Sequence, residues 1–177
     1  MTAPRSLRST RIYKGEVINL RVDEIELPSG RVAQREVVEH RGAVAIVPIT
    51  ATGAVVLVRQ FRLAALANLL EIPAGTVEPG ESVAAALERE LAEEIGMRAT
   101  HVEPLCSFFP SPGFLTEQVH IFLAQDLHPH RLQGEEEDLT VIQVPLREAR
   151  DLVTQGEIRD AKSIIGLLLA AERVRPG

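Results

Sequence analysis

A glycine-containing loop that leads into an acidic helix, at residues 75–97, constrains this chain more than any other feature. Gly75 is followed after five residues by Glu81 and, after seven more, by the run Arg89-Glu90-Leu91-Ala92-Glu93-Glu94-Ile95-Gly96-Met97. Ser82 is a favourable N-cap, and Gly96 readily adopts the left-handed conformation that ends a helix. We therefore predict a loop at residues 74–80 and a helix at residues 82–95.

Three glutamates of this helix share one face. Glu90, Glu93 and Glu94 are three and four positions apart, so at about 100° per residue they fall within one arc. Like charges this close destabilise a helix unless a cation offsets them, and Mg²⁺ and Mn²⁺ prefer clustered carboxylate oxygens. An acidic helix face is ordinarily only solvated. These acids, however, stand at fixed offsets from Gly75 and Arg89, which favours a metal site.

Charge and composition exclude several classes of protein. The net charge of −6 and the pI near 5.4 argue against a nucleic-acid or anionic-membrane partner, because the field of the whole chain repels anions. The 177 residues suffice for one compact domain, and no segment approaches the roughly 20 apolar residues of a membrane span. Residues 1–14 lack the apolar core of a secretory signal, and the lone Cys106 cannot form an internal disulfide. We therefore expect a cytoplasmic protein.

The rest of the chain alternates strand-like and helical segments, which predicts an α+β fold. Residues 15–27 and 31–40 flank Pro28-Ser29-Gly30 and are predicted to form an N-terminal hairpin. Residues 43–49 and 55–61 are predicted to form a second hairpin, and residues 69–73 a short apolar strand with one acid, Glu71. Further strands are expected at residues 101–108 and 118–125, an apolar run follows at residues 139–145, and helices are expected at residues 147–154 and 161–173.

Residues 75–97 resemble the signature of the Nudix hydrolases at every defining position. The resemblance implies an α/β/α sandwich with a mixed sheet at residues 41–177, preceded by an N-terminal hairpin region at residues 1–40. It also implies an enzyme that hydrolyses a nucleoside diphosphate linked to another group, with Mg²⁺ or Mn²⁺ as cofactor. The metal ligands that it implies are Glu90, Glu93, Glu94 and the backbone carbonyl of Ala74, with Glu81 as a supporting acid. Arg89 would pair with one of these carboxylates and, with Glu94, belong to the catalytic set.

Motifs outside this signature resemble the ADP-ribose pyrophosphatase branch of the family. They are Val58-Arg59-Gln60-Phe61-Arg62, Glu71-Ile72-Pro73-Ala74-Gly75, Ser111-Pro112-Gly113-Phe114 and the segment 156–164. Pro112 also lies fifteen residues beyond Met97, a spacing that is typical of the branch. The resemblance implies hydrolysis of ADP-ribose to AMP and ribose 5-phosphate. The alternatives are a pyrophosphatase for another nucleotide sugar, such as GDP-mannose or ADP-glucose, and a non-catalytic sensor of ADP-ribose.

Four basic and acidic residues are candidate contacts to the nucleotide. Arg59 suits a substrate phosphate, because a guanidinium fork matches phosphate geometry, and Arg62 is a second candidate. Arg35 and Glu36 resemble a pair that, in the family, reaches the adenine across a homodimer. Alternating charge on an exposed strand explains Arg35 and Glu36 equally well.

Two loops supply the remaining candidates. Glu117 resembles the acid that binds the terminal ribose, and Gly113 would let the loop backbone approach the sugar. The acidic loop at residues 134–138 resembles one that closes over the site and positions or deprotonates water. Glu135 is the preferred base and Glu137 a further metal ligand, although the sequence leaves open which of the two acts as the base.

Overall fold

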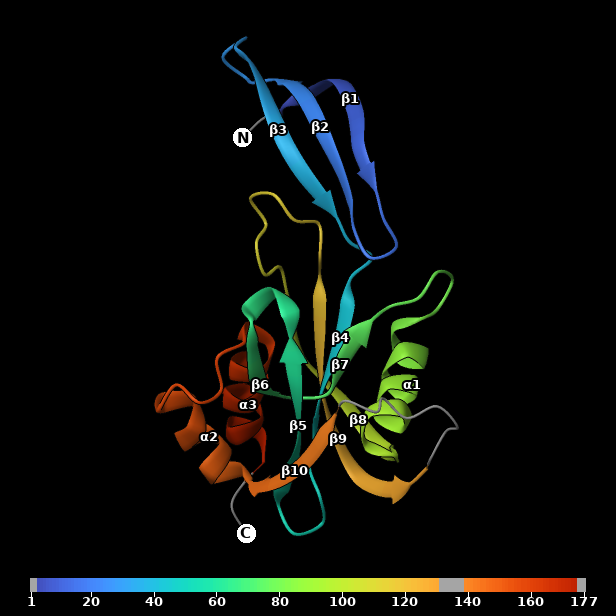
Figure 1. The fold of residues 1–177 in the computed structure, drawn as a ribbon, viewed down its shortest axis with the longest axis vertical. Helices are drawn as coiled ribbons and strands as arrows, with labels where there is room; N and C mark the ends of the chain where they lie inside the picture. The colour runs from blue at the N-terminus through green and yellow to red at the C-terminus, as the bar shows by residue number, and fades with distance from the viewer. Residues whose placement is uncertain (1–2, 131–138, 175–177) are drawn as a thin grey trace. The chain divides into compact units, whose positions relative to one another are not determined.

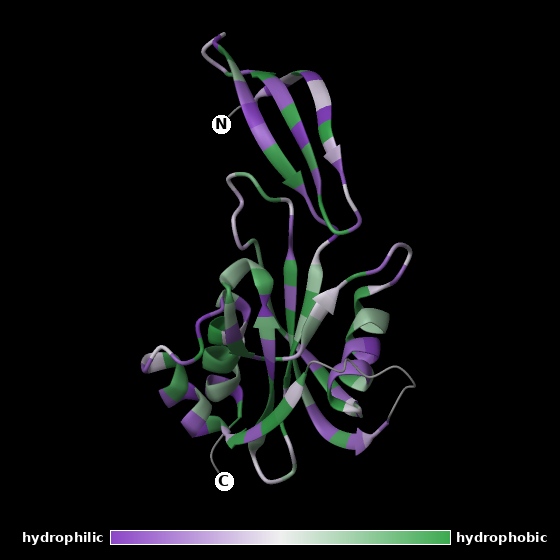
Figure 2. Cartoon of the chain, viewed as in Figure 1, coloured by the Kyte–Doolittle hydropathy of each residue, from purple (hydrophilic) through white to green (hydrophobic). Residues whose placement is uncertain are grey.

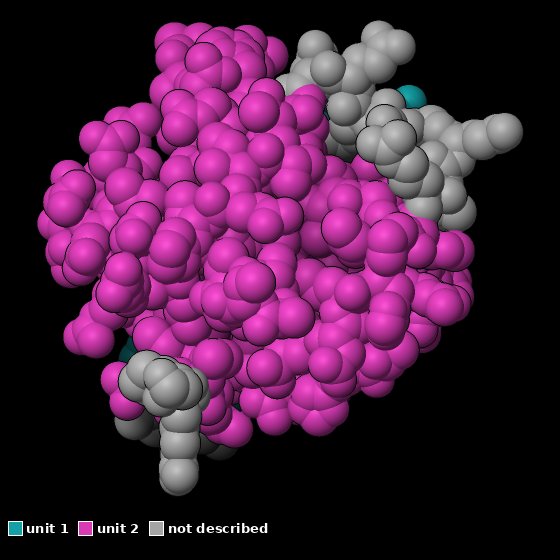
Figure 3. Space-filling view, turned by 90° about the horizontal axis from the view of Figure 1, so that it is seen from below, with its two compact units in different colours: residues 1–42, 108–118 teal, residues 43–107, 119–177 magenta. Residues whose placement is uncertain are grey.

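The computed structural model describes residues 3–130 and 139–174, and the chain divides into two compact units. Unit 1 contains Met1–Gly42 and Phe108–Gln118, and unit 2 contains Ala43–Ser107 and Val119–Gly177. Figure 1 traces the chain, and Figure 3 distinguishes the units by colour and shows one face of unit 2. The division into residues 1–40 and 41–177 stays a prediction, and the compact units also place the segment 108–118 with the N-terminal strands.

Unit 1 contains a three-stranded antiparallel sheet in the order β1-β2-β3, formed by β1 (Arg5–Lys14), β2 (Asn19–Glu26) and β3 (Val32–Glu39). The predicted N-terminal hairpin is confirmed as β2 and β3. Its turn closes with a hydrogen bond of 2.8 Å from Gly30 N to Leu27 O, and Gly30 has a φ of 81° that favours glycine. The sequence pattern does not predict β1, because all of its residues are exposed and no alternating buried face marks it.

The segment 108–118 is hydrogen-bonded to the end of β3 within unit 1. Val38 N donates to Phe114 O at 2.7 Å, and Thr116 N donates to Val38 O at 3.0 Å. His40 N donates to Thr116 Oγ1 at 2.9 Å. Two stretches of sequence about 75 residues apart are therefore held together by backbone contacts, which the order of motifs along the chain does not predict.

The described residues of unit 2 form two sheets and three α-helices. One sheet has the order β7-β4-β9-β8, with β4 (Ala43–Pro48), β7 (Ala74–Thr76), β8 (Met97–Phe108) and β9 (Val119–Pro129). The other has the order β10-β5-β6, with β5 (Ala54–Arg62), β6 (Ala67–Glu71) and β10 (Thr140–Pro145). A short 3₁₀ helix, η1 (Leu63–Ala65), joins β5 to β6. The helices are α1 (Val83–Ile95), α2 (Leu146–Thr154) and α3 (Ala161–Arg173).

The predicted sandwich with a mixed sheet is confirmed. Strand β4 pairs in parallel with β9 and antiparallel with β7. In Figure 1, α1 lies on one side of the strands of unit 2, and α2 and α3 lie on the other. None of the helices within residues 3–130 and 139–174 has the length and apolar character needed to cross a membrane.

Two sequence predictions for unit 2 are wrong. Strands β4 and β5 do not pair as a hairpin, because a tight turn and the isolated bridge between Ile49 and Val55 join them and they then enter different sheets. The predicted loop at residues 74–80 begins with strand β7, which pairs Ala74 with Ala45 and Gly75 with Val44. Both errors arise because strand partners are chosen by packing in three dimensions, whereas the sequence shows only which segments are adjacent.

Strand β4 forms the centre of the core and is buried at every position. Val44 and Ile46 pack in one hydrophobic cluster with Leu87 and Leu91 of α1. A Cβ added to Gly166 of α3 would lie 3.0 Å from Val47 Cγ2, so the other face of β4 is closely covered by α3. Figure 2 shows hydrophobic residues along the central strands of unit 2, with hydrophilic residues between them on β5 and β9. Helices on both faces explain why β4 is apolar throughout instead of alternating.

Candidate active site

Helix α1 begins and ends where its sequence predicts. The Ser82 side chain accepts a hydrogen bond from Ala85 N at 3.1 Å, and Gly96 ends the helix with a φ of 64°. Leu91 and its apolar neighbours form a stripe on α1 that packs against β4. The glutamates at the margin of this stripe are therefore partly buried. Glu90 is 6% exposed and Glu94 is 7% exposed. The helix thus places two carboxylates at the edge of the core.

Glu81, Glu90, Glu93 and Glu94 form an acidic cluster, and Arg89 donates hydrogen bonds to the first three of them. Its Nε donates to Glu81 Oε1 at 2.9 Å, and its Nη1 donates to Glu90 Oε1 at 2.6 Å and to Glu93 Oε2 at 3.0 Å. Its Nη2 donates to Glu81 Oε2 and to Thr76 O, both at 3.1 Å. One guanidinium therefore binds the backbone of β7, the side chain of Glu81 and two glutamates of α1. The structure contains the pairing of Arg89 with a signature carboxylate that the resemblance implies, and extends it to three carboxylates.

Gly75 is required by the position of Glu90. A Cβ at residue 75 would lie 1.8 Å from Glu90 Oε1 and 2.1 Å from the carboxyl carbon. The φ of Gly75 lies outside the left-handed range, so the backbone conformation by itself does not demand glycine. The requirement is for space, because the carboxylate of Glu90 occupies the place of a side chain on β7.

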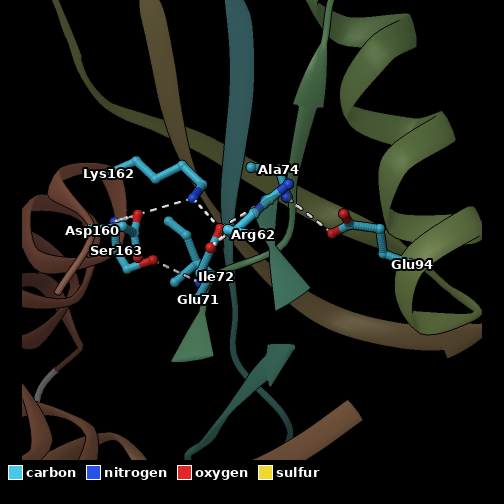
Figure 4. A network of polar contacts seen from close by, with 8 residues as sticks. All are labelled: Arg62, Glu71, Ile72, Ala74, Glu94, Asp160, Lys162 and Ser163. Atoms are coloured by element: carbon cyan, nitrogen blue, oxygen red, sulfur yellow. Dashed lines mark hydrogen bonds and ion pairs between the residues drawn. The ribbon is translucent and has the colours of Figure 1, made fainter. Parts of the chain in front are cut away.

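Glu94 contacts the same short strand from the other end of the cluster. Its Oε2 accepts a hydrogen bond of 2.9 Å from Ala74 N, as Figure 4 shows. Strand β7 is therefore contacted by Glu94 at Ala74, by Glu90 at Gly75 and by Arg89 at Thr76. Three consecutive residues of one strand are fixed by the acidic end of one helix.

Hydrogen bonds within this cluster favour the charged forms of Glu81 and Arg89. The hydrogen bonds from Arg89 and from Glu78 N lower the pKa of Glu81 below its usual value, despite some desolvation. The pKa of Arg89 is raised, mainly by its hydrogen bonds to Glu81 and further by Glu93 and Glu90. Four carboxylates and one guanidinium carry more negative than positive charge, which suits a hard divalent cation.

The carboxylates form two groups in this structure. Glu90 and Glu93 turn to Arg89, whereas Glu94 turns to the amide of Ala74. Within residues 3–130 and 139–174, no group of three or more His, Cys, Asp or Glu side chains is already arranged to hold a metal ion. Glu93 is the acid with most freedom to reorient, because its side chain is 36% exposed.

A second polar network lies beside Ala74 and includes the predicted phosphate ligand Arg62. Arg62 donates from Nε to Glu71 Oε1 at 2.9 Å and from Nη2 to Glu71 Oε2 at 2.8 Å. Lys162 Nζ contacts Glu71 Oε2 and donates to Asp160 Oδ2 at 2.9 Å. Burial opposes the charged form of Glu71, but the Arg62 hydrogen bonds and the Lys162 charge outweigh it and lower its pKa. Figure 4 shows these side chains converging on the end of β6.

The predicted substrate residues lie in both units. Arg59 is exposed on β5 of unit 2, while Arg62 has two guanidinium nitrogens bound to Glu71. Arg35 and Glu36 are exposed neighbours on β3 of unit 1. Arg59, Arg35 and Glu36 are thus exposed, whereas Arg62 is partly buried in an ion pair.

The loop candidates Gly113 and Glu117 belong to unit 1, the same compact unit as Arg35 and Glu36. Gly113 is exposed, and a Cβ on it would meet nothing within 4 Å. Glu117 Oε1 lies 3.7 Å from His40 Nδ1, which accepts a hydrogen bond of 3.0 Å from Gly42 N. Glu135 and Glu137 lie outside the described residues.

Sequence reasoning missed Glu71 and Lys162 as parts of this site. One signal was the lone acid in the short apolar strand at residues 69–73, since a buried carboxylate needs a cationic partner. Another was the resemblance of residues 71–75 and 156–164 to the ADP-ribose pyrophosphatase branch, which assigns neither residue a role. The partner could not be identified from the sequence, because Lys162 is 91 positions away on α3. Ser163 lies in the segment 156–164 that resembles the branch, but the resemblance does not predict that its hydroxyl accepts a hydrogen bond of 2.8 Å from Ile72 N.

This loop, strand and helix arrangement agrees with the family comparisons. The sequence matches the NUDIX domain over residues 39–165 and the nucleoside diphosphate sugar hydrolase N-terminal domain over residues 5–38. The NUDIX match covers well over half of the chain. The chain therefore belongs to the Nudix family.

Three relatives extend this assignment over most of the chain. An ADP-ribose pyrophosphatase of Bacillus subtilis (strain 168) is 40% identical over 162 residues, which is 90% of this chain and 88% of that protein. A methanol dehydrogenase activator of Bacillus methanolicus is 36% identical over 166 residues, or 92% and 90% of the two chains. The crystal structure of an ADP compounds hydrolase superposes with a TM-score of 0.87 at 28% identity, covering 98% of this chain and 95% of that one. The similarity thus includes both compact units.

Proposed function

We propose that this Nudix protein hydrolyses the pyrophosphate of ADP-ribose to AMP and ribose 5-phosphate. The observation that carries the proposal is the acidic cluster on β7 and α1, in which Glu90 fills the space beside Gly75 and Glu94 binds the amide of Ala74. The choice of substrate is supported by the B. subtilis ADP-ribose pyrophosphatase, which matches 90% of the chain. A pyrophosphatase for GDP-mannose or ADP-glucose is the alternative that a substrate panel tests.

The acidic cluster suits a divalent metal ion, on which Nudix ADP-ribose pyrophosphatases depend. We assign Glu90, Glu93, Glu94 and the Ala74 carbonyl as ligands of Mg²⁺, with Mn²⁺ as a substitute, because clustered oxygens suit hard cations. When bound, the metal polarises phosphate oxygens and lowers the pKa of water. Arg89 binds Glu90, Glu93 and the Thr76 carbonyl of β7, which keeps these two carboxylates near the strand that carries Ala74.

The protein's other residues bind and orient the nucleotide. Arg59 is assigned to a phosphate, because it is exposed and its fork-shaped guanidinium matches phosphate oxygens. Arg62 orients Glu71 in addition to any phosphate contact, since its bidentate ion pair is already formed. Glu135 and Glu137, outside the described residues, are assigned to deprotonation or positioning of water, with Glu137 as a further metal ligand.

Four residues of unit 1 are assigned to the ends of the substrate. Arg35 and Glu36 would contact the adenine, and their exposure on β3 leaves both side chains accessible. Glu117 would accept hydrogen bonds from the terminal ribose, with Gly113 beside it in the same segment. Their common location in unit 1 supports a role of this unit in substrate choice.

Turnover of ADP-ribose by the purified protein with Mg²⁺ tests the activity. Glu90→Gln and Glu94→Gln should each lose most of the turnover, whereas Glu88→Gln, an exposed glutamate on the same helix, should retain it. GDP-mannose and ADP-glucose, assayed in parallel, test the alternative substrates. Equal turnover by all variants would remove the helix acids from the mechanism, and stoichiometric binding of ADP-ribose without turnover would indicate a sensor.

A homodimer in the cytoplasm completes the proposal. The dimer is supported by β1, the exposed edge strand of unit 1, where Ile12 is 58% exposed and Tyr13 is 56% exposed. Light scattering on the wild type and on Ile12→Glu tests it, and a fully active wild-type monomer would refute the dimer. The cytoplasm is supported by the lone Cys106, and cell fractionation tests it.

A further inference from the structure

The three residues that precede Gly75 are each held by a different element of unit 2. The hydrogen bonds are Ile72 N to Ser163 Oγ at 2.8 Å, Ile46 N to Pro73 O at 2.8 Å, and Ala74 N to Glu94 Oε2 at 2.9 Å. Helix α3, strand β4 and helix α1 therefore fix successive positions of one short segment. The contact from α3 is buried, since Ile72 and Ser163 are both 0% exposed.

Glu71, the residue before this segment, is anchored to the same end of α3 by charge. Its side chain is 2% exposed, and Lys162 contacts its Oε2 while also binding Asp160, the N-cap of α3. Lys162 is one of only two lysines in a chain that otherwise uses arginine. A compact ammonium on a flexible stem can lie between two carboxylates where the Arg62 guanidinium already takes one side of Glu71.

We infer that Lys162 is a positioning residue for the metal site, because its contact with Glu71, beside the hydrogen bond of Ser163 to Ile72, fixes the segment that carries Ala74. The start of α3 thereby determines where the Ala74 carbonyl and the carboxylate of Glu94 stand. Figure 4 shows this path from Asp160 and Lys162 through Glu71 and Ile72 to Ala74 and Glu94. The inference rests on the proposed role of Ala74 and Glu94 as metal ligands.

The direction in which Lys162→Met changes the affinity for a cation distinguishes positioning from simple electrostatics. Lys162→Met removes a positive charge from the neighbourhood of an acidic cluster, and a through-space effect alone would strengthen the binding of a cation. Loss of positioning has the opposite effect, because a displaced carbonyl and carboxylate bind the cation less well. The same substitution thus tightens cation binding under one account and weakens it under the other.

Titration with Mn²⁺, monitored by the electron paramagnetic resonance signal of the free ion, measures the Mn²⁺ affinity of each variant and requires no substrate turnover. Lys162→Met and Ser163→Ala should each weaken Mn²⁺ binding by about 10-fold, the lower end of what partners of metal ligands contribute. Arg159→Met, an exposed cation three positions from Lys162, controls for charge alone and should leave the affinity unchanged or slightly tighter. Hydrogen exchange at the Ile72 amide should be faster in both network variants.

Two outcomes would overturn the positioning role of Lys162 and the metal site separately. Mn²⁺ affinity of Lys162→Met equal to or tighter than wild type, with Glu90→Gln and Glu94→Gln both weakened, would overturn the positioning role and leave the proposed function intact. Wild-type Mn²⁺ affinity in Glu90→Gln and Glu94→Gln would instead overturn the metal site and the inference with it. If Lys162→Met does not fold, Ser163→Ala tests positioning by the start of α3, because it removes a neutral hydrogen bond and changes no charge. Wild-type Mn²⁺ affinity in that variant would then overturn the positioning role.

Discussion

Gly75→Ala tests the placement of Glu90 directly. The new Cβ would lie 1.8 Å from Glu90 Oε1, and ordinary van der Waals contact begins at 3.4 Å, so the carboxylate must retreat by about 1.6 Å. The displaced atoms are the end of a flexible side chain, so the fold should survive. Retreat breaks the 2.6 Å hydrogen bond from Arg89, however, and charged hydrogen bonds contribute about 1.5–3 kcal/mol.

The expected cost follows from these distances. For a chain of this size, about 1.5–3 kcal/mol corresponds to a fall in Tm of roughly 3–12 °C. Misplacing a reacting group by about 1 Å can lower turnover by roughly 100-fold, so ADP-ribose hydrolysis should fall at least that far. Differential scanning fluorimetry and a steady-state assay at saturating Mg²⁺ measure the two effects.

Gly53→Ala is the matched control for Gly75→Ala. Gly53 has a φ of 77° and open space where the methyl group of alanine would stand, so the substitution adds backbone strain of about 1–2 kcal/mol without touching the cluster. It should lower Tm and preserve turnover. In a Glu90→Ala background, Gly75→Ala should become nearly neutral for stability, because the clashing carboxylate is gone. Wild-type turnover and metal affinity in the single Gly75→Ala variant would refute the position of Glu90 beside β7.

Three further predictions concern the ion pairs and the metal. Arg89→Lys should lose most turnover and lower Tm, because one ammonium cannot replace the guanidinium that binds Glu81, Glu90, Glu93 and Thr76 O; kinetics and thermal unfolding check this. Glu71 has a lowered pKa in the folded state, so its stabilisation is present above the ordinary pKa of 4.5 and is lost as the pH falls through the lower folded value. Glu71→Gln should therefore lower the free energy of unfolding at pH 7 by about 2–3 kcal/mol, which is less than for a fully buried pair because Arg62 is 39% exposed. Urea titrations should show that the stability of this variant falls less steeply at acid pH than that of the wild type. Chelation with EDTA should abolish hydrolysis, and added Mg²⁺ should restore it; turnover that persists in EDTA would contradict the metal assignment.

The sequence predicts best where a single segment contains all the determinants. Helix α1 is an example, because Ser82, Gly96 and the apolar stripe between them lie within one stretch, and its caps form as predicted. The N-terminal hairpin is another, because Gly30 supplies the turn that joins two adjacent strands. In both cases the contacts that decide the structure are local in sequence.

Prediction fails where distant segments decide the outcome. β4 and β5 are adjacent in sequence and β-branched, yet β4 pairs with β9 and β7 in one sheet, whereas β5 pairs with β10 and β6 in another. Strand β1 gives no pattern because none of its residues is buried. The helix spacing correctly brings Glu90, Glu93 and Glu94 to one side, but it does not reveal that Arg89 takes two of them while Ala74 takes the third.

The segment 108–118 complicates any truncation of this protein. Its backbone partners Val38 and His40 belong to the N-terminal strands, so a shortened chain that begins after residue 40 would leave Phe114 O and Thr116 N without them. Such a chain would lose the support of Gly113 and Glu117 together with any subunit contact. Inactivity after N-terminal deletion is therefore ambiguous, and point substitutions on β1 are the cleaner way to separate assembly from ligand recognition.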